Sequence, residues 1–140
     1  VDQETKAAID QILTGGFATE EDTLETINKV FSKEGYTLDT HTAVAVKVYD
    51  QYVQNTGDKT KTVIDSTASP YKFNTSVLEA IEGKGAVQGK DEFSIVEKLS
   101  KVSEIPIHPA LKDLDKKPVL HKTVVDKDEI KKAVEDILGV

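Results

Sequence analysis

The chain has 140 residues, 38% of them hydrophobic, so it is long and apolar enough to form one ordinary domain with a buried core. Its net charge of −7 opposes contact with a phosphate backbone and disfavours nucleic acid as a partner. The sequence lacks Cys, an apolar run long enough for a membrane span, and a signal peptide. We therefore expect a cytoplasmic protein without disulfides, thiolate metal sites or a membrane partner.

The first 35 residues have the hydrophobic spacing of two helices. Residues 4–14 place apolar side chains on one face, and a pair of glycines follows. Thr19 and Asp22 have the spacing of a capping box, which indicates the start of a second helix. Gly35 is expected to end that helix, because glycine readily adopts the left-handed backbone found after many helices.

The strongest helical pattern covers residues 40–55, which carry a wide apolar stripe opposite charged and polar side chains. Either Asp39 or Thr40 can supply its N-terminal cap. The β-branched run at 62–66 then predicts a short strand, which ends in small hydroxyl residues.

The second half of the chain alternates helices with loops. Asn74 or Thr75 can cap a helix, and another helix is expected at about 91–102. A second strand is expected at 119–125, before a last helix that begins near Asp126. The predicted fold is therefore mainly α with one or two short β-strands. So few strands do not make a sheet, so either the strand prediction is wrong or the partner strands lie in a second copy or in a missing part of the same polypeptide.

Motifs for several other chemistries fail on inspection. The segment GKGAVQGKD at 83–91 resembles a phosphate loop, but its glycine spacing is one residue too long and Asp91 stands where Ser or Thr would bind magnesium. His41, His108 and His121 have no ligand-like spacing, so no metal site is predicted. No Ser lies in a G-x-S-x-G elbow.

Two stretches contain residues that could form a ligand-binding site. Each also has a purely structural interpretation. LDTHTAVAVKVY at 38–49 opens the best helix, so its Asp, Thr and His can serve as capping and first-turn residues. STASPYKF at 66–73 can be a simple connection that turns at Pro70. It can also place hydroxyls at the carboxyl end of a strand, where α/β sheets bind ligands.

Taken together, these stretches resemble the C-terminal third of the threonine synthases. That family has Gly-Tyr, then Asp-Pro-His-Thr-Ala-Val-Ala on a helix, then a strand that ends in Thr-Ala-His-Pro-Ala-Lys-Phe. The matching residues here are Asp39, His41, Thr42, Ala43, Val44, Ala45, Thr67, Ala68, Pro70, Lys72 and Phe73. The resemblance is specific over about residues 15–82 and generic from 83 to 140. Thr40 replaces the family's Pro, and Ser69 replaces its usual His.

The resemblance implies a fragment of a larger enzyme. The family converts O-phospho-L-homoserine and water to L-threonine and phosphate with pyridoxal 5′-phosphate (PLP), on an α/β fold of the tryptophan-synthase-β-like type. The family's Schiff-base lysine motif and glycine-rich phosphate loop are not found in these 140 residues, and the chain lacks Met. We therefore expect the C-terminal fragment of such an enzyme, inactive alone, with no catalytic residue of its own.

The resemblance also implies roles for individual residues. Thr67 matches the threonine whose hydroxyl faces the pyridine nitrogen of PLP, and Ser66 is expected to contact the cofactor or orient the loop beside it. Lys72 and His41 are candidates for binding the phosphorylated amino acid. For Lys72 the alternatives are pairing with a carboxylate or solvent exposure. Asp39 fixes the start of its helix.

The predicted organisation is one C-terminal region, with a helical part at 1–60, a strand-turn-helix at the cofactor edge at 61–83 and a helical cap at 84–140. Its main partner would be the remainder of the same polypeptide, and the fragment could also self-associate in a non-native way. Two alternatives stay open. One is a free-standing helical protein-interaction domain, and the other is a part of a different PLP enzyme with the same fold.

Overall fold

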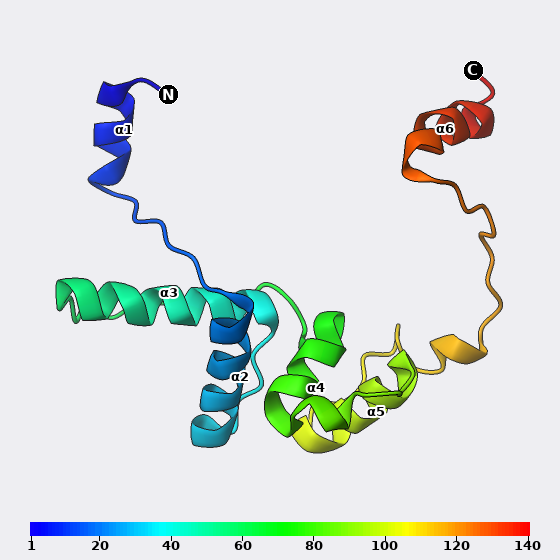
Figure 1. The fold of residues 1–140 in the computed structure, drawn as a ribbon, viewed down its shortest axis with the longest axis horizontal. Helices are drawn as coiled ribbons and strands as arrows, with labels where there is room; N and C mark the ends of the chain where they lie inside the picture. The colour runs from blue at the N-terminus through cyan, green and yellow to red at the C-terminus, as the bar shows by residue number, and fades with distance from the viewer. The chain divides into compact units, whose positions relative to one another are not determined.

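A computed structural model describes residues 1–140 and shows an all-α protein (Figure 1). The α-helices are α1 (Gln3–Asp10), α2 (Glu20–Glu34), α3 (Thr40–Thr56), α4 (Asn74–Glu82), α5 (Glu92–Ser103) and α6 (Ile130–Leu138). The short 3-10 helices are η1 (Pro70–Phe73), η2 (Lys84–Ala86), η3 (Leu114–Lys116) and η4 (Lys127–Glu129). The chain forms two compact units, Val1–Pro109 and Ala110–Val140. None of the helices combines the length and the hydropathy needed to cross a bilayer.

The first unit has its core where α2 packs against both α3 and α4, and where α4 packs against α5. Ile27, Val77, Leu78 and Leu99 are completely buried there. The other buried apolar residues are Leu38, Ala43, Tyr71, Ala86, Ile95 and Val96. Val77 and Leu78 of α4 and Ile95, Val96 and Leu99 of α5 lie on the apolar faces that the sequence pattern predicts for these helices. In α2 the buried residues are Ile27 and two threonines, Thr23 and Thr26.

Local capping confirms where the second and third helices begin. Thr19 and Asp22 form a reciprocal capping box at α2, in which the Thr19 hydroxyl accepts from the Asp22 amide and the Asp22 carboxylate accepts from the Thr19 amide. Gly35 ends α2 in the left-handed conformation, with a φ of 67°. Asp39 caps α3, while Thr40 is its first helical residue. The alternative cap, Thr40, is therefore excluded.

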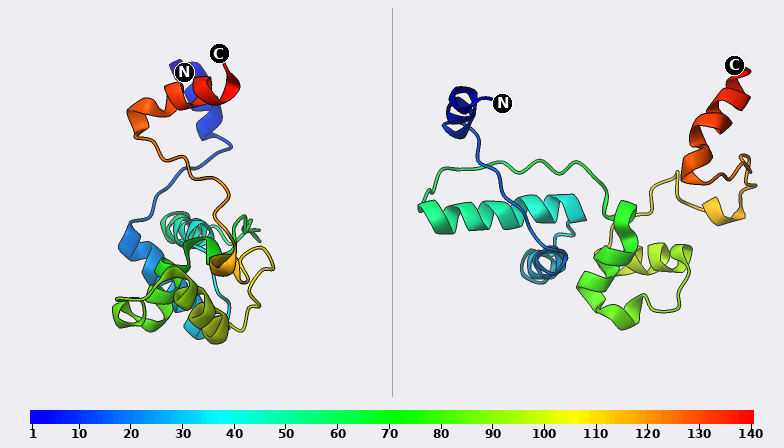
Figure 2. Two further views of the ribbon diagram at one scale, coloured as in Figure 1. Left: turned by 90° about the vertical axis from the view of Figure 1, so that its right-hand side faces the viewer. Right: turned by 45° about the horizontal axis from the view of Figure 1, so that its top comes forward.

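The two predicted strands are wrong, because residues 62–66 and 119–125 belong to no sheet. Both segments are extended coil, and Val63 is 84% exposed. β-Branched residues favour an extended backbone, but a strand needs a neighbour to accept and donate its ladder hydrogen bonds. Figure 2 shows the extended segment between α3 and α4 returning along the length of α3 without such a neighbour.

Two predicted helix ends also differ from the structure. Helix α1 stops at Asp10, short of residue 14, and it has no buried side chain that would extend it by packing. Neither Asn74 nor Thr75 caps α4 with its side chain. Instead, the 3-10 turn η1 leads directly into α4, and the Ser69 hydroxyl caps that turn by accepting from the Tyr71 amide at 3.3 Å. The Asn74 amide donates to the Glu92 carboxylate of α5 at 3.2 Å.

The second unit consists of η3, an extended segment, η4 and α6. Helix α6 has an apolar stripe of Ile130, Val134, Ile137 and Leu138, and all four side chains are exposed. The predicted last helix is thus confirmed, and η4 forms its entry. The predicted functional divisions at residues 60 and 83 stay a prediction.

Candidate functional site at the start of helix α3

The start of α3 is organised around the carboxylate of Asp39, which is only 1% exposed. One carboxylate oxygen, Oδ1, accepts from the backbone amides of His41 at 2.9 Å and Thr42 at 3.2 Å. The other, Oδ2, accepts a short hydrogen bond from the Thr42 hydroxyl. Amides at the first turn of a helix have no intrahelical partner, so this cap satisfies them and compensates for burial of the charge.

Ser66 joins this group from a segment far away in the sequence. Its Oγ lies 3.2 Å from Oγ1 of Thr42, within hydrogen-bonding distance. Thr67 follows directly, is exposed and makes no side-chain hydrogen bond within the chain. The two hydroxyl residues predicted to meet a cofactor are therefore placed beside the start of α3, and the Thr67 hydroxyl remains available to an outside acceptor.

His41 and Lys72 meet through a third residue, Phe73. The imidazole centroid of His41 lies 5.1 Å from the Phe73 ring centroid, with the planes inclined at 41°. The Lys72 ammonium lies 5.4 Å from the same centroid, within the range of a cation–π contact. Nδ1 of His41 is also 3.7 Å from Oδ1 of Asp39. The structure thus brings together two candidate substrate residues that are 31 positions apart in the sequence.

Sequence reasoning gave Phe73 and Thr42 no role, although both belong to the motifs that carry the resemblance. Phe73 is half-buried and Thr42 is 4% exposed. Their positions in the motif could have indicated that they belong to the site. Thr42 lies three residues after the predicted cap, and Phe73 directly follows Lys72. Neither position shows from spacing alone which distant residue it contacts.

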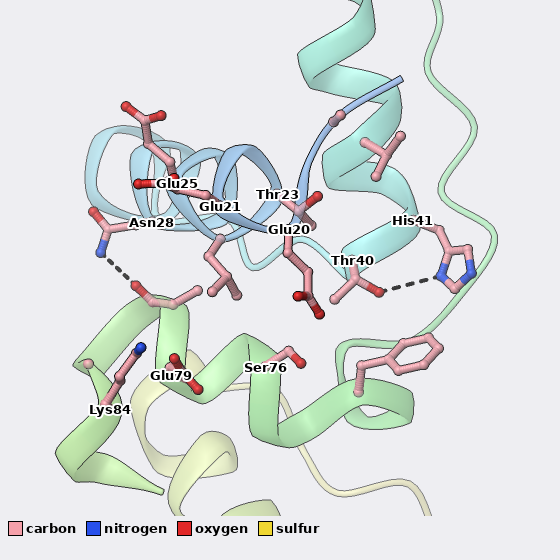
Figure 3. Close-up of a pocket in the computed structure, with 16 residues that line it drawn as sticks. Glu20, Glu21, Thr23, Glu25, Asn28, Thr40, His41, Ser76, Glu79 and Lys84 are labelled. Atoms are coloured by element: carbon pink, nitrogen blue, oxygen red, sulfur yellow. Dashed lines mark hydrogen bonds between the residues drawn. The ribbon is translucent and has the colours of Figure 1, made fainter. Parts of the chain in front are cut away.

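An open groove of about 1200 Å³ begins at His41, Thr40 and Phe73 and continues between α2 and α4. Figure 3 shows Glu20 projecting into the space between these helices, while His41 lies at the edge. The Asn28 amide donates to the Ala80 carbonyl at 2.8 Å across the groove. Its charged lining residues are Glu20, Glu21, Glu25, Glu79 and Lys84. This excess of carboxylates makes the groove unfavourable for anions.

A smaller hollow of about 210 Å³ lies beside the segment that carries Thr67. Its lining residues are Gly35, Tyr36, Thr37, Ser66, Ala68, Pro70, Ser103 and Ile105. Thr37 is 6% exposed, and its hydroxyl oxygen is buried without a hydrogen-bond partner. The segment from Ser66 to Pro70 therefore borders open space on one side and does not lie within a packed core.

Comparison with known protein families shows which family the chain belongs to. Residues 42–137, more than half of the chain, match the family model described as threonine synthase, C-terminal. The chain belongs to this family. The resemblance in the sequence is therefore confirmed at the family level.

The threonine synthase family match includes most of the site. Thr42, Ser66, Thr67, Lys72 and Phe73 all lie within the matched residues. Asp39, Thr40 and His41, at the start of α3, lie just before the match begins. The match also continues through α5 and α6, where the sequence by itself offered no motif.

Proposed function

We propose that this chain is the C-terminal part of a PLP-dependent threonine synthase, which converts O-phospho-L-homoserine and water to L-threonine and phosphate. The family match supports this proposal most strongly. In the complete enzyme, of the tryptophan-synthase-β-like fold, the preceding part would supply the Schiff-base lysine and the loop for the cofactor phosphate. This chain would supply one edge of the site.

The chemistry of the exposed hydroxyl of Thr67 fits a contact with the cofactor ring. A threonine hydroxyl is neutral and can donate to a pyridine nitrogen without forcing that nitrogen to be protonated. When bound, PLP supplies an electron sink for carbanions, and the partner of its ring nitrogen tunes how strong that sink is. Thr67 would donate this hydrogen bond, and Ser66 would fix the backbone on which Thr67 lies.

The edge formed by His41 and Lys72 fits the phosphate of the substrate. Both side chains are exposed and contact the Phe73 ring, and the ammonium of Lys72 makes no ion pair within the chain. An ammonium attracts a phosphate oxygen, and a protonated imidazole can add a second charge-assisted donor. Lys72 would therefore bind the phosphate, while the acidic groove keeps the anion at this edge.

Two assays test the proposal. The 140-residue chain mixed with PLP should give neither internal-aldimine absorbance nor threonine from O-phospho-L-homoserine. The polypeptide encoded in the same reading frame with the sequence upstream of Val1 should give both. Threonine formation by the chain alone would contradict the fragment interpretation, and an upstream sequence without a PLP lysine motif would contradict the enzyme itself.

In the complete enzyme, two variants test the assigned roles. Thr67→Val should change the cofactor absorbance and lower kcat, while Thr67→Ser should retain both, because only the hydroxyl matters. Lys72→Ala should raise KM for the phosphorylated substrate by about tenfold, the effect of one charge-assisted hydrogen bond. Lys61→Ala, at another exposed lysine of the connection between α3 and α4, is the matched control. Equal effects of the two lysine variants would argue against a phosphate site at Lys72.

The alternative of a protein-interaction domain is favoured by one observation, the exposed apolar stripe of α6. A stripe of this kind is what a helix needs in order to dock on another surface. The two functions differ in a simple assay, because an interaction domain would bind a separate protein and would have no reading frame that continues upstream into a PLP motif.

A further inference from the structure

Thr42 occupies a position that links the interior of the unit to the exposed segment. The residue is 4% exposed and lies in the first turn of α3. Its hydroxyl contacts Oδ2 of Asp39 on one side and lies 3.2 Å from Oγ of Ser66 on the other. Ser66 is 24 positions further along the chain, so this contact is tertiary and not a property of the helix.

The chemistry of the three groups sets the direction of the protons. A carboxylate only accepts hydrogen bonds, so the single proton of the Thr42 hydroxyl is directed at Asp39. Ser66 must then donate its own proton to the lone pair of Thr42. The result is an oriented series from Ser66 through Thr42 to Asp39, and the buried negative charge strengthens each step.

This series is the hydrogen-bonded anchor of the segment that precedes Thr67. Residues 61–65 are exposed or half-buried coil, and none of them makes a hydrogen bond to a helix. The next anchor follows at Tyr71, whose hydroxyl donates to the Ile105 carbonyl at 2.5 Å. Thr67 therefore lies between two tertiary hydrogen bonds, one at Ser66 and one at Tyr71.

The geometry points to Thr42 as a positioning residue for the cofactor-contacting segment Ser66–Ala68. Thr42 transmits the fixed position of the buried Asp39 carboxylate to Ser66, and through Ser66 to the neighbouring Thr67. The inference rests on the proposed function for its meaning, because that function assigns the cofactor contact to Thr67. Its structural content, the ordering of the segment by the Thr42 hydroxyl, is independent of any cofactor.

The first experiment uses the 140-residue chain and measures backbone NMR order parameters. Thr42→Val removes the hydroxyl but keeps the branched shape, and Ser66→Ala removes the other end of the bond while leaving the cap of α3 intact. Both variants should lower the order parameters of residues 65–68 and leave those of residues 43–56 unchanged. Thr42→Ser should restore the values of the unmodified chain.

Thr26→Val is the matched control. Thr26 is also a buried helical threonine, at 5% exposure, and its hydroxyl donates to the Asp22 carbonyl within its own helix. It should leave residues 65–68 ordered. Unchanged order parameters for residues 65–68 in both Thr42→Val and Ser66→Ala would overturn the inference, as would an equal loss in Thr26→Val.

The second experiment uses the complete enzyme and reads the bound cofactor. Thr42→Val should weaken PLP binding by about tenfold and shift the absorbance of the bound ring, since one oriented hydrogen bond is lost. Thr42→Ser should restore both. If the chain experiment succeeds but the cofactor readouts do not change, the assignment of Thr67 to PLP fails and the ordering role of Thr42 stands. If Thr42→Val leaves the segment ordered, the inference fails whatever the cofactor does.

Discussion

Helices α3 and α6 are both amphipathic in sequence, but their surroundings differ. Helix α3 begins at a buried carboxylate with three hydrogen bonds and buries Thr42 and Ala43. Helix α6 has no side-chain cap and no buried residue, and Ile137 in its apolar stripe is 75% exposed. Periodicity therefore specifies which face of a helix is apolar, whereas the surface that covers this face is decided by residues elsewhere.

The largest expected contrast between the helical core and α6 comes from truncating one leucine in each. Leu78→Ala should lower the free energy of unfolding by about 2–5 kcal/mol, because truncating this fully buried side chain of α4 leaves a cavity in the core. Leu138→Ala, at a position that is 68% exposed, should change it by less than about 0.5 kcal/mol. Urea denaturation measures both. Equal losses would show that α6 is packed in solution.

A smaller contrast is expected between the starts of the two helices. Asp39→Ala leaves two backbone amides and the buried Thr42 hydroxyl without their acceptor, and should cost about 2 kcal/mol. Asp126→Ala is the matched change before η4 and α6, where the aspartate makes no cap hydrogen bond, and should be close to neutral. Thermal unfolding followed by circular dichroism compares the variants. A neutral Asp39→Ala would contradict the importance of the buried cap.

A substitution in the loop that leads away from α3 should lower the free energy of unfolding by a smaller amount. Tyr71→Phe removes the hydrogen bond to the Ile105 carbonyl, but that carbonyl still accepts from the Ser100 hydroxyl at 2.8 Å. The loss should be about 1 kcal/mol, because no buried acceptor is left unsatisfied. Tyr36→Phe, at a position that is 55% exposed, is the control. A loss in Tyr71→Phe no larger than in this control would remove Tyr71 as an anchor of the segment.

The smallest expected effect on stability comes from the ion pair between Asp22 of α2 and Lys47 of α3. A hydrogen bond from Lys47, together with those from Thr19, lowers the pKa of Asp22 from 3.8 to about 2. Because the folded value is the lower one, the unfolded chain takes up this proton first. The stabilisation is complete above about pH 4 and is lost as the pH falls towards 2. NMR titration of Lys47→Met should show the Asp22 pKa raised towards 3.8, while Lys29→Met should leave it unchanged. An unchanged Asp22 pKa in Lys47→Met would disprove the assignment.

The features that the sequence predicted correctly are local ones. Helix caps depend on residues within one turn, so a few consecutive residues are enough to predict them. Examples are the capping box of Thr19 and Asp22 and the cap at Asp39. The failures involve distant partners. Residues 62–66 have the composition of a strand, but no second strand exists beside them.

The same distinction applies to the candidate site. The motif predicted roles for Ser66, Thr67, His41 and Lys72, because they occur in a recognisable order. The motif did not show that Thr42 connects Ser66 to Asp39, or that the Phe73 ring lies against both His41 and Lys72. Such contacts depend on how two segments meet in space, which spacing along one segment does not contain.

The contact between Ser66 and Thr42 also sets a minimum length for the segment that connects α3 to Ser66. From Thr42 to Gly57 the helix advances about 22 Å, and the chain from Gly57 to Ser66 must cover that distance in return with a maximum reach of about 30 Å. The segment is thus extended because it must span α3, with no sheet needed to straighten it. Deleting four of its residues would reduce its reach to about 17 Å and separate Ser66 from Thr42, whereas a few added residues would keep the contact at a small entropic cost.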